Sequence, residues 1–242
     1  MLMMKLALPL MPVMAVYILA AVLPAIVLLR YVYRHDRVEK EPMGLLLSLL
    51  VMGVVSALCS TVLERVGQTV LYLLVDPGRP AYTILLAFLV VALVEEGTKF
   101  FFLKRRTWHN PNFNYRFDGI VYAVFVSLGF AAYENIGYVM SYGLSVALAR
   151  AVSAIPGHMA FAVFMGLFYG RAKVCRNWGD ERGCEKNLRR GYVSAVLLHG
   201  FYDACAMIGS NTAIIVFLVF VVLLFLTVFR LVKRESATDM PV

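Results

Sequence analysis

The feature that most constrains this chain is a series of long apolar runs that recur along nearly its whole length. A helix needs about 20 apolar residues to cross the hydrocarbon core of a bilayer. The runs that meet or approach this length are 6–29, 43–63, 81–103, 117–139, 151–170, 191–208 and 212–229. A further run, 66–75, is too short to cross, and we expect it to lie at the membrane interface or to dip into the bilayer. The sequence therefore predicts an all-α, polytopic bundle of about seven transmembrane helices, forming a single membrane domain over residues 1–242.

The composition excludes other classes of protein. Hydrophobic residues make up 61% and charged residues 16% of the 242 residues, whereas soluble domains average about 45–50% and about 25%. A secreted disulfide scaffold, a DNA-binding domain and a disordered tail are therefore excluded.

The distribution of basic residues predicts the orientation of the bundle. The net charge is +8, and in membrane proteins an excess of Lys and Arg marks the cytoplasmic loops. Most of the 23 Lys and Arg residues lie in segments 30–42, 104–116, 171–190 and 230–234. The opposite side receives Lys5, Arg65, Arg79 and Arg150. We therefore expect the N-terminus outside and the C-terminus inside, with the basic loops contacting membrane lipid and no nucleic acid as partner.

Ionisable side chains interrupt four consecutive apolar runs. They are Glu95, Glu96, Lys99, Glu134, His158, His199 and Asp203. Each costs about 2.5–3.5 kcal/mol in the hydrocarbon even on a lenient insertion scale. One such residue could serve helix packing, but Ser or Asn would serve that purpose at lower cost. Seven together indicate a functional site, so we expect the catalytic core in residues 81–208.

The spacing of these residues suggests how they pair. Glu95 and Lys99 are four residues apart and can pair along one helix face, while Glu96 lies about 100° further round. We therefore expect one carboxylate to be neutralised and the other to remain available as a base. His199 and Asp203 are also four residues apart, which suits two metal ligands or a carboxylate that orients a ligating imidazole.

Two histidines and several carboxylates on separate helices are enough to hold a zinc ion with one open position. His158 follows Pro156-Gly157, where a broken helical turn could direct its ring. A further carboxylate would then deprotonate water, so the predicted reaction is hydrolysis of a bond within the membrane. A mechanism without metal, in which a glutamate alone activates water, also remains open.

Other protease patterns are absent from the sequence. There is no H-E-x-x-H motif of the helical zinc proteases. There is no G-x-G-D, and Asp203 is the only aspartate deep in a span, so an aspartyl dyad cannot form. No glycine follows Ser145, which we expect to begin a helix rather than to act as a nucleophile.

Four ordered motifs resemble those of the PrsW-type membrane proteases, relatives of the CAAX-processing and bacteriocin-processing enzymes. Residues 95–99 match E-E-x-x-K, residues 130–134 match F-x-x-x-E, His158 matches the single histidine of the next motif, and residues 199–203 match H-x-x-x-D. The CAAX branch has F-x-x-x-H and H-x-x-x-N in place of the second and fourth motifs. The set falls one motif to a span, which makes it far more specific than any single motif.

The resemblance implies an intramembrane endopeptidase in which Glu95 and Glu96 activate water. It assigns metal binding, or polarisation of the scissile carbonyl, to Glu134, His158, His199 and Asp203. We expect a supporting role for Lys99, Phe130, Asn135 and Tyr138. The expected cofactor is Zn²⁺, and the expected substrate is a single-pass membrane protein or a membrane peptide. The best-known role of the family is the first cut of an anti-sigma factor in the bacterial plasma membrane.

Helix geometry places one of these residues too deep for a shared site. With about 1.5 Å of rise per residue, Glu96 lies roughly 10 Å from the cytoplasmic end of its span but Glu134 lies roughly 26 Å from its own. We expect the span of Glu134 to begin further into the cytoplasm than Phe117; the other interpretation is that Glu134 lines the substrate channel.

Two other classes of function fit the same residues. Clustered Glu, His and Asp side chains beside a Pro-Gly break also build ion pathways in transporters and proton relays. A membrane scaffold that binds single-pass partners without cleaving them is the third possibility. The ordered motifs and the lack of an inverted repeat favour the protease.

Overall fold

The chain folds into helices along almost its whole length in the computed structural model, which describes the backbone of residues 2–242 and the side chains from Pro12 onward. The elements are α1 (Leu2–His35), α2 (Met43–Leu74), α3 (Pro80–Leu85), the π-helix η1 (Leu86–Ala92), α4 (Leu93–Thr107), α5 (Asp118–Tyr142), α6 (Leu144–Val152), α7 (Ala154–Asn177), α8 (Glu181–Ile208) and α9 (Asn211–Ala237). The described residues form no strand, and their one β-bridge joins Tyr115 to Pro241. The side chain of Lys5 lies outside the described residues, as do those at the start of the expected span 6–29.

Among the described residues, six helical segments, one of them made of α6 and α7 together, are long and apolar enough to cross a membrane. They cover residues 12–35, 43–74, 118–142, 144–177, 181–208 and 211–237. The expected span 81–103 is also helical, but it is divided among α3, η1 and α4 and carries three charged residues. The prediction of an all-α, multi-span bundle is confirmed, while the orientation of its termini stays a prediction.

The run 66–75 is not a separate interfacial segment. It continues α2 without a break, and the 32 residues of this helix extend about 48 Å at 1.5 Å per residue. The helix is therefore longer than the roughly 30 Å of hydrocarbon that it crosses.

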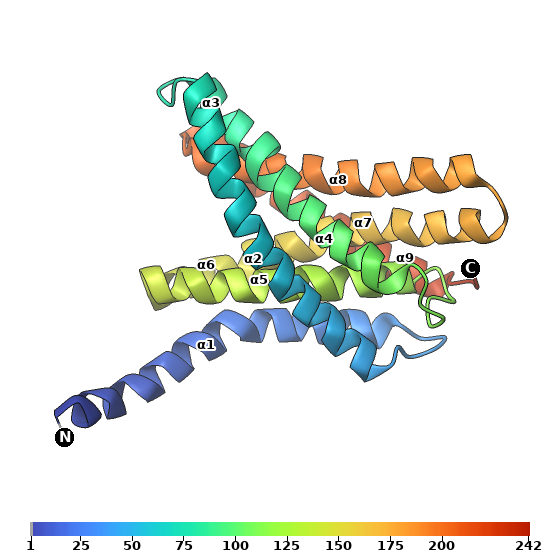
Figure 1. Ribbon diagram of the computed structural model, residues 1–242, viewed down its shortest axis with the longest axis horizontal. Coiled ribbons are helices and arrows are strands. Elements are labelled where there is room, and N and C mark those ends of the chain that lie inside the picture. Colours follow the sequence, from blue (N-terminus) through green and yellow to red (C-terminus); the bar gives the residue numbers. More distant parts are fainter. Residues whose placement is uncertain (1) are drawn as a thin grey trace.

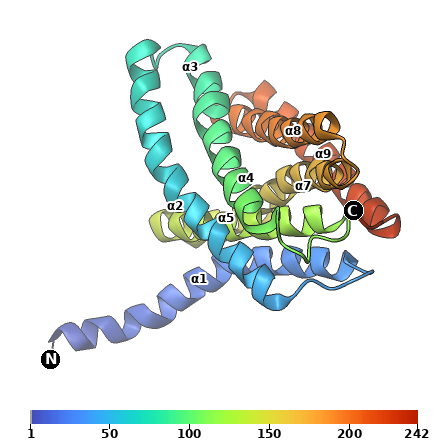
Figure 2. The same cartoon turned by 45° about the vertical axis from the view of Figure 1, so that its right-hand side comes forward.

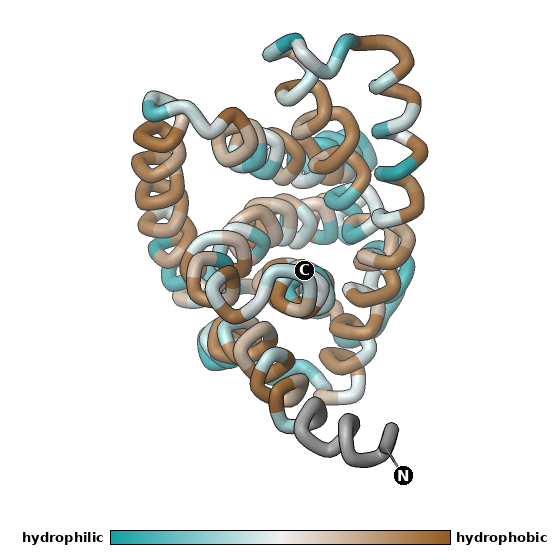
Figure 3. The backbone as a smooth tube through the Cα atoms, turned by 90° about the vertical axis from the view of Figure 1, so that its left-hand side faces the viewer, coloured by the Kyte–Doolittle hydropathy of each residue, from teal (hydrophilic) through white to brown (hydrophobic). Residues whose placement is uncertain are grey.

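Helix α5 is the centre of the bundle. Every residue from Asp118 to Ala131 is buried, as expected for a helix that is apolar on all sides, and α5 packs against α1, α2 and α7. Figure 1 shows α5, α7 and α8 lying side by side while α2 and α4 cross them obliquely. Figure 2 shows α2 and α4 running next to each other, joined through α3. Apolar residues prevail along most of the tube in Figure 3, which suits helices that face lipid.

The depth of Glu134 is explained by its neighbours, not by an earlier start of its own helix. Helix α5 begins at Asp118, close to the expected position. Helices α7 and α8 instead extend well beyond their apolar runs, to Asn177 and from Glu181. Counted from these helix ends, Glu134, His158 and His199 lie roughly 24–29 Å along their helices, and Asp203 lies one turn further, at roughly 33 Å. They can therefore share one site.

Glycines allow α2 and α5 to cross in backbone contact. A Cβ atom at Gly53 would collide with the carbonyl oxygen of Val126, and one at Gly129 would collide with the backbone of Leu50. Small residues at such crossings let membrane helices approach closely. The crossing fixes where α2 diverges from α5, and a groove of about 590 Å³ opens beyond it.

We predict that Gly129→Ala destabilises the protein, because the added methyl group overpacks the crossing at a typical cost of about 1–3 kcal/mol. The matched control is Gly137→Ala on the same helix, where an added Cβ meets no atom within 4 Å. That control should be neutral or gain about 0.5–1 kcal/mol from helix propensity. Thermal unfolding in detergent measures both, and equal melting temperatures for the two variants would contradict the close crossing.

Buried carboxyl groups gather at the end of the bundle where α1 meets α2. Asp36 and Glu41 are 1% and 4% exposed. Burial raises the pKa of Asp36 to about 6 and that of Glu41 to about 7, and it also raises the pKa of Asp239. Asp239 belongs to the C-terminal tail and accepts a hydrogen bond from the Phe117 amide at 2.8 Å, so the tail is held against the start of α5.

We predict that the protein becomes less stable as the pH rises through about 6 to 7. The folded chain binds the protons of Asp36 and Glu41 more tightly than the unfolded chain does, so the free energy of unfolding falls with rising pH. This stabilisation is complete below about pH 4, the unfolded pKa range. Melting temperatures at about pH 5 and pH 8 test this, with Asp36→Asn/Glu41→Gln as the control that should flatten the difference. An unchanged difference in that variant would contradict the assignment.

Candidate active site

The structure brings together all seven ionisable side chains singled out in the sequence. Four elements supply them: α4 carries Glu95, Glu96 and Lys99; α5 carries Glu134; α7 carries His158; and α8 carries His199 and Asp203. Glu95, Glu96, Lys99, His158 and His199 are each at most 5% exposed. The polar groups therefore meet inside the bundle instead of serving four separate helix contacts.

Lys99 lies at the centre of this cluster. Its Nζ donates to Glu95 Oε2 at 3.1 Å and to Glu96 Oε1 at 2.8 Å, and it lies 3.2 Å from His158 Nδ1. The same ammonium sits 4.0 Å from the centre of the Phe130 ring. The expectation that Lys99 neutralises only one glutamate is therefore wrong, because its long side chain reaches both.

Glu95 and Glu96 nevertheless differ in what they face. Glu96 is fully buried and accepts a hydrogen bond from His199 Nδ1 at 2.9 Å. With Nδ1 as the donor, His199 turns Nε2 toward Glu95 Oε2 at 4.0 Å and Asp203 Oδ2 at 3.3 Å. The ring of Phe161 stacks on His199 with centroids 4.7 Å apart. Glu96 thus fixes the orientation of a histidine, whereas Glu95 lines the cavities.

Glu134 reaches the cluster through His158. Its Oε2 lies 3.1 Å from His158 Nε2 and accepts a hydrogen bond from Arg150 Nη2 at 2.8 Å. The helix break that positions His158 occurs at Ser153, where the backbone angles leave the helical region. Pro156 and Gly157 follow inside the first turns of α7, where proline is tolerated.

Helix α4 is preceded by the π-helix η1, which ends three residues before Glu95. Such segments often accompany functional sites because they change the direction of the side chains that follow. Gly200 of α8 packs on Phe88 of η1, and a Cβ at this position would collide with the Phe88 ring. The π-helix and the glycine together set α4 close to α8.

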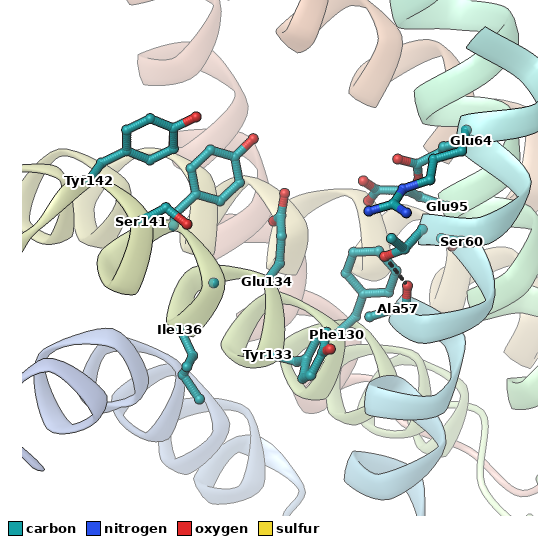
Figure 4. A pocket seen from close by; sticks show the side chains of 14 residues that line it. Ala57, Ser60, Glu64, Glu95, Phe130, Tyr133, Glu134, Ile136, Ser141 and Tyr142 are labelled. Carbon is teal, nitrogen blue, oxygen red and sulfur yellow. Dashed lines mark hydrogen bonds between the residues drawn. The ribbon is translucent and has the colours of Figure 1, made fainter. Parts of the chain in front are cut away.

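Two connected cavities lead to these residues. The outer groove, of about 590 Å³, runs between α2 and α5 and ends at Glu95, and the inner chamber measures about 170 Å³. The chamber is lined by residues that include Glu64, Glu95, Glu134, Arg150, His158, His199 and Asp203. Figure 4 shows Glu64, Glu95 and Glu134 directed into the same space, with Ser60 beside them and Tyr142 further along α5.

Sequence reasoning missed Glu64 and Arg150. Glu64 lies just beyond the expected span 43–63, and it would have been noticed if the run 66–75 had been recognised as part of α2. It follows Ala57 and Ser60 along one face of that helix, at spacings of three and four residues, and all three line the groove. The sequence predicts Arg150 only as a basic residue on the outer side of the membrane.

The residues of the chamber fit a divalent metal ion. Ligand atoms of Glu95, His158 and His199 all lie within 4.8 Å of one another, and two histidines with one carboxylate are a common catalytic zinc set. Glu64, Glu95, Glu96, Glu134 and Asp203 outnumber the cationic side chains here, Lys99 and Arg150. Glu96 Oε2 also has no hydrogen-bond partner among the described residues. A bound cation would balance this excess of negative charge.

These features define a multi-span membrane protein with a buried, hydrolase-type site of glutamates and histidines. Comparison with known proteins identifies the family. The sequence profile described as "PrsW family intramembrane metalloprotease" matches residues 41–229. The chain therefore belongs to the PrsW family and is an intramembrane protease.

Relatives that align with most of the chain support this family assignment. "Protease PrsW" of Geobacillus kaustophilus is 34% identical over 76% of this chain and 76% of its own length. The proteins of the same name from Clostridioides difficile and Bacillus subtilis are 33% and 31% identical, covering 85% and 91% of this chain and 85% and 96% of their own lengths. No solved structure matches the chain. The comparisons favour proteolysis over the transporter and scaffold alternatives.

We predict that Lys99→Met strongly destabilises the protein, because it leaves Glu95 and Glu96 buried without their cation. Removing one partner of a buried ion pair typically costs about 3–5 kcal/mol. Combining Lys99→Met with Glu95→Gln and Glu96→Gln removes the unpaired charges and should recover much of the loss. Thermal unfolding of the three proteins measures this, and a Lys99→Met variant as stable as the wild type would contradict the central role of the ammonium.

Proposed function

We propose that this protein hydrolyses a peptide bond of a single-pass membrane protein, with Glu95 as the general base. The observation that carries the proposal is the division of labour within the glutamate pair. Glu95 faces the groove and the chamber, while Glu96 lies behind it, bonded to Lys99 and His199. Only Glu95 is therefore placed to meet a water molecule and a substrate.

The chemistry of the site follows from these positions. Glu95 accepts a proton from the attacking water and later delivers it to the leaving amine. Lys99 donates to both glutamates in their buried setting, and Glu96 holds His199 so that Nε2 faces the chamber. Asp203 lies beside that nitrogen, where it can share in metal binding or orient the group that polarises the scissile carbonyl.

We propose zinc as the metal, held by Glu95, His158 and His199, with Glu134 and Asp203 next to the two histidines. When bound, the ion lowers the pKa of water and polarises the carbonyl. With an ion bound, Glu95 would serve both as one of its ligands and as the acceptor of the proton. The chain's own residues thus bind the ion, direct its ligands and transfer the proton.

The groove suits an extended segment of a membrane-spanning substrate. A helix must unwind before its peptide bond can be cut, and its exposed amide groups then need polar partners inside the membrane. Hydroxyl groups of Ser60, Thr61, Tyr138 and Ser141 line the groove and can supply them. With the N-terminus outside, the groove residues of α2 and α5 lie in the outer halves of these helices. We therefore propose cleavage toward the outer side of a bacterial plasma membrane, with an anti-sigma factor as the substrate.

The proposed function is tested by cleavage in proteoliposomes. A single-pass protein with a different label at each end serves as the substrate, and the wild type should cut it. Glu95→Gln should lower kcat by about 10²–10⁴, the range for loss of a general base. Glu96→Gln should cost less, because its amide oxygen can still accept from His199 Nδ1.

The matched control is Glu185→Gln, which changes an exposed glutamate of α8 that pairs with Arg189 and should leave the rate unchanged. A larger loss in Glu96→Gln than in Glu95→Gln would overturn the assignment of the base. Failure of the purified wild type to cut any single-pass substrate would contradict the proposed substrate class.

A further inference from the structure

We propose that Arg150 is a positioning residue for the reaction, which holds Glu134 against His158. The inference rests on the proposed function. Arg150 belongs to α6, outside the four sequence motifs, yet it lines the inner chamber and its side chain is only 15% exposed. A buried arginine needs a reason, because its desolvation is costly unless every contact is well formed.

Three contacts hold the guanidinium from different directions. Nη2 donates to Glu134 Oε2 at 2.8 Å, Nε donates to Asn135 Oδ1 at 2.8 Å, and the central carbon lies 3.8 Å from the centre of the Tyr138 ring. Two separate donors and a flat stacking face are properties of arginine that lysine lacks. The position therefore calls for arginine in particular, not only for a positive charge.

The contacts connect the chamber to the backbone of α1. Asn135 is fully buried and donates to the backbone carbonyl of Ala21 in α1 at 2.8 Å. Arg150 is thus anchored through Asn135 and presents its other donor to Glu134. The opposite end of this series is His158, whose Nε2 meets the same Oε2 of Glu134 at 3.1 Å.

Glu134 needs such a restraint because it borders open space. Its side chain is 26% exposed and lines both the groove and the chamber. Without Arg150 its carboxylate could rotate into the groove, and His158 would lose the partner at its Nε2, keeping only the Lys99 contact at Nδ1. Partners that orient a ligating histidine typically change metal affinity or activity by about 10–100-fold. Arg150 therefore acts on the site through Glu134 and need not touch the substrate.

The test compares Arg150→Ala and Arg150→Lys with the wild type in proteoliposomes, using kcat, KM and zinc affinity. Arg150→Ala should lower kcat and zinc affinity by about 10–100-fold, with KM changed by less than about threefold. Arg150→Lys can pair with Glu134 but not with Asn135 as well, so its loss should be intermediate. Because Arg150→Lys keeps a positive charge beside Glu134, it serves as the test variant if Arg150→Ala does not fold. Arg79→Ala, an exposed arginine on the same predicted side, is the matched control and should behave like the wild type.

A double-mutant cycle separates positioning from a general structural effect. If Arg150 acts through Glu134, adding Glu134→Gln to Arg150→Ala should lower kcat and zinc affinity by little more than the single change. Fully additive losses, or zinc affinity and kcat equal to the wild type in Arg150→Ala, would overturn the inference. Because zinc affinity is measured without substrate, it tests Arg150 even if the proposed substrate class is wrong.

Discussion

The ammonium group of Lys99 is the interaction on which the rest of this structure depends. It is buried among Glu95, Glu96 and His158, where an unpaired charge of either sign would be too costly to retain. The carboxylates and histidines can stay inside the bundle only while α4, α5, α7 and α8 remain packed around that ammonium. The glycine contact between α2 and α5 and the packing of Gly200 on Phe88 are therefore conditions for the active site as well as for the fold.

The chamber and the groove beside it suit two tasks, the binding of a cation and the binding of a substrate peptide. Its glutamates and aspartate exceed its cationic side chains, which favours a bound cation, and the hydroxyl-lined groove beside it offers partners for an unwound peptide. Glu95 borders both cavities, so in the proposed mechanism the water that it activates can meet a substrate that arrives from the side. The surrounding helices present apolar residues outward, so the polar interior is enclosed within a lipid-compatible surface.

The sequence singled out the seven ionisable residues because each is costly in a membrane, and the structure brings their side chains together. It did not predict that Lys99 pairs with both glutamates. Helix phase gives the direction in which a side chain leaves the backbone, but it does not give the position of the charged group at the end of a long, flexible side chain. Glu64 and Arg150 escaped notice because they lie beyond the ends of apolar runs. The full lengths of α7 and α8 were not predicted for the same reason, because the last turns of α7 and the first turns of α8 are polar and hydropathy does not register them.

We propose that Glu95, His158 and His199 form a metal site inside the membrane. The most direct test of this proposal is the metal content of the purified, metal-replete protein in detergent, with His158→Ala and His199→Ala beside the wild type. The account predicts about one zinc ion per wild-type chain, as expected for a catalytic site, and loss of that ion in both variants while the fold is retained. A metal-free wild type, or variants that keep the ion, would contradict it.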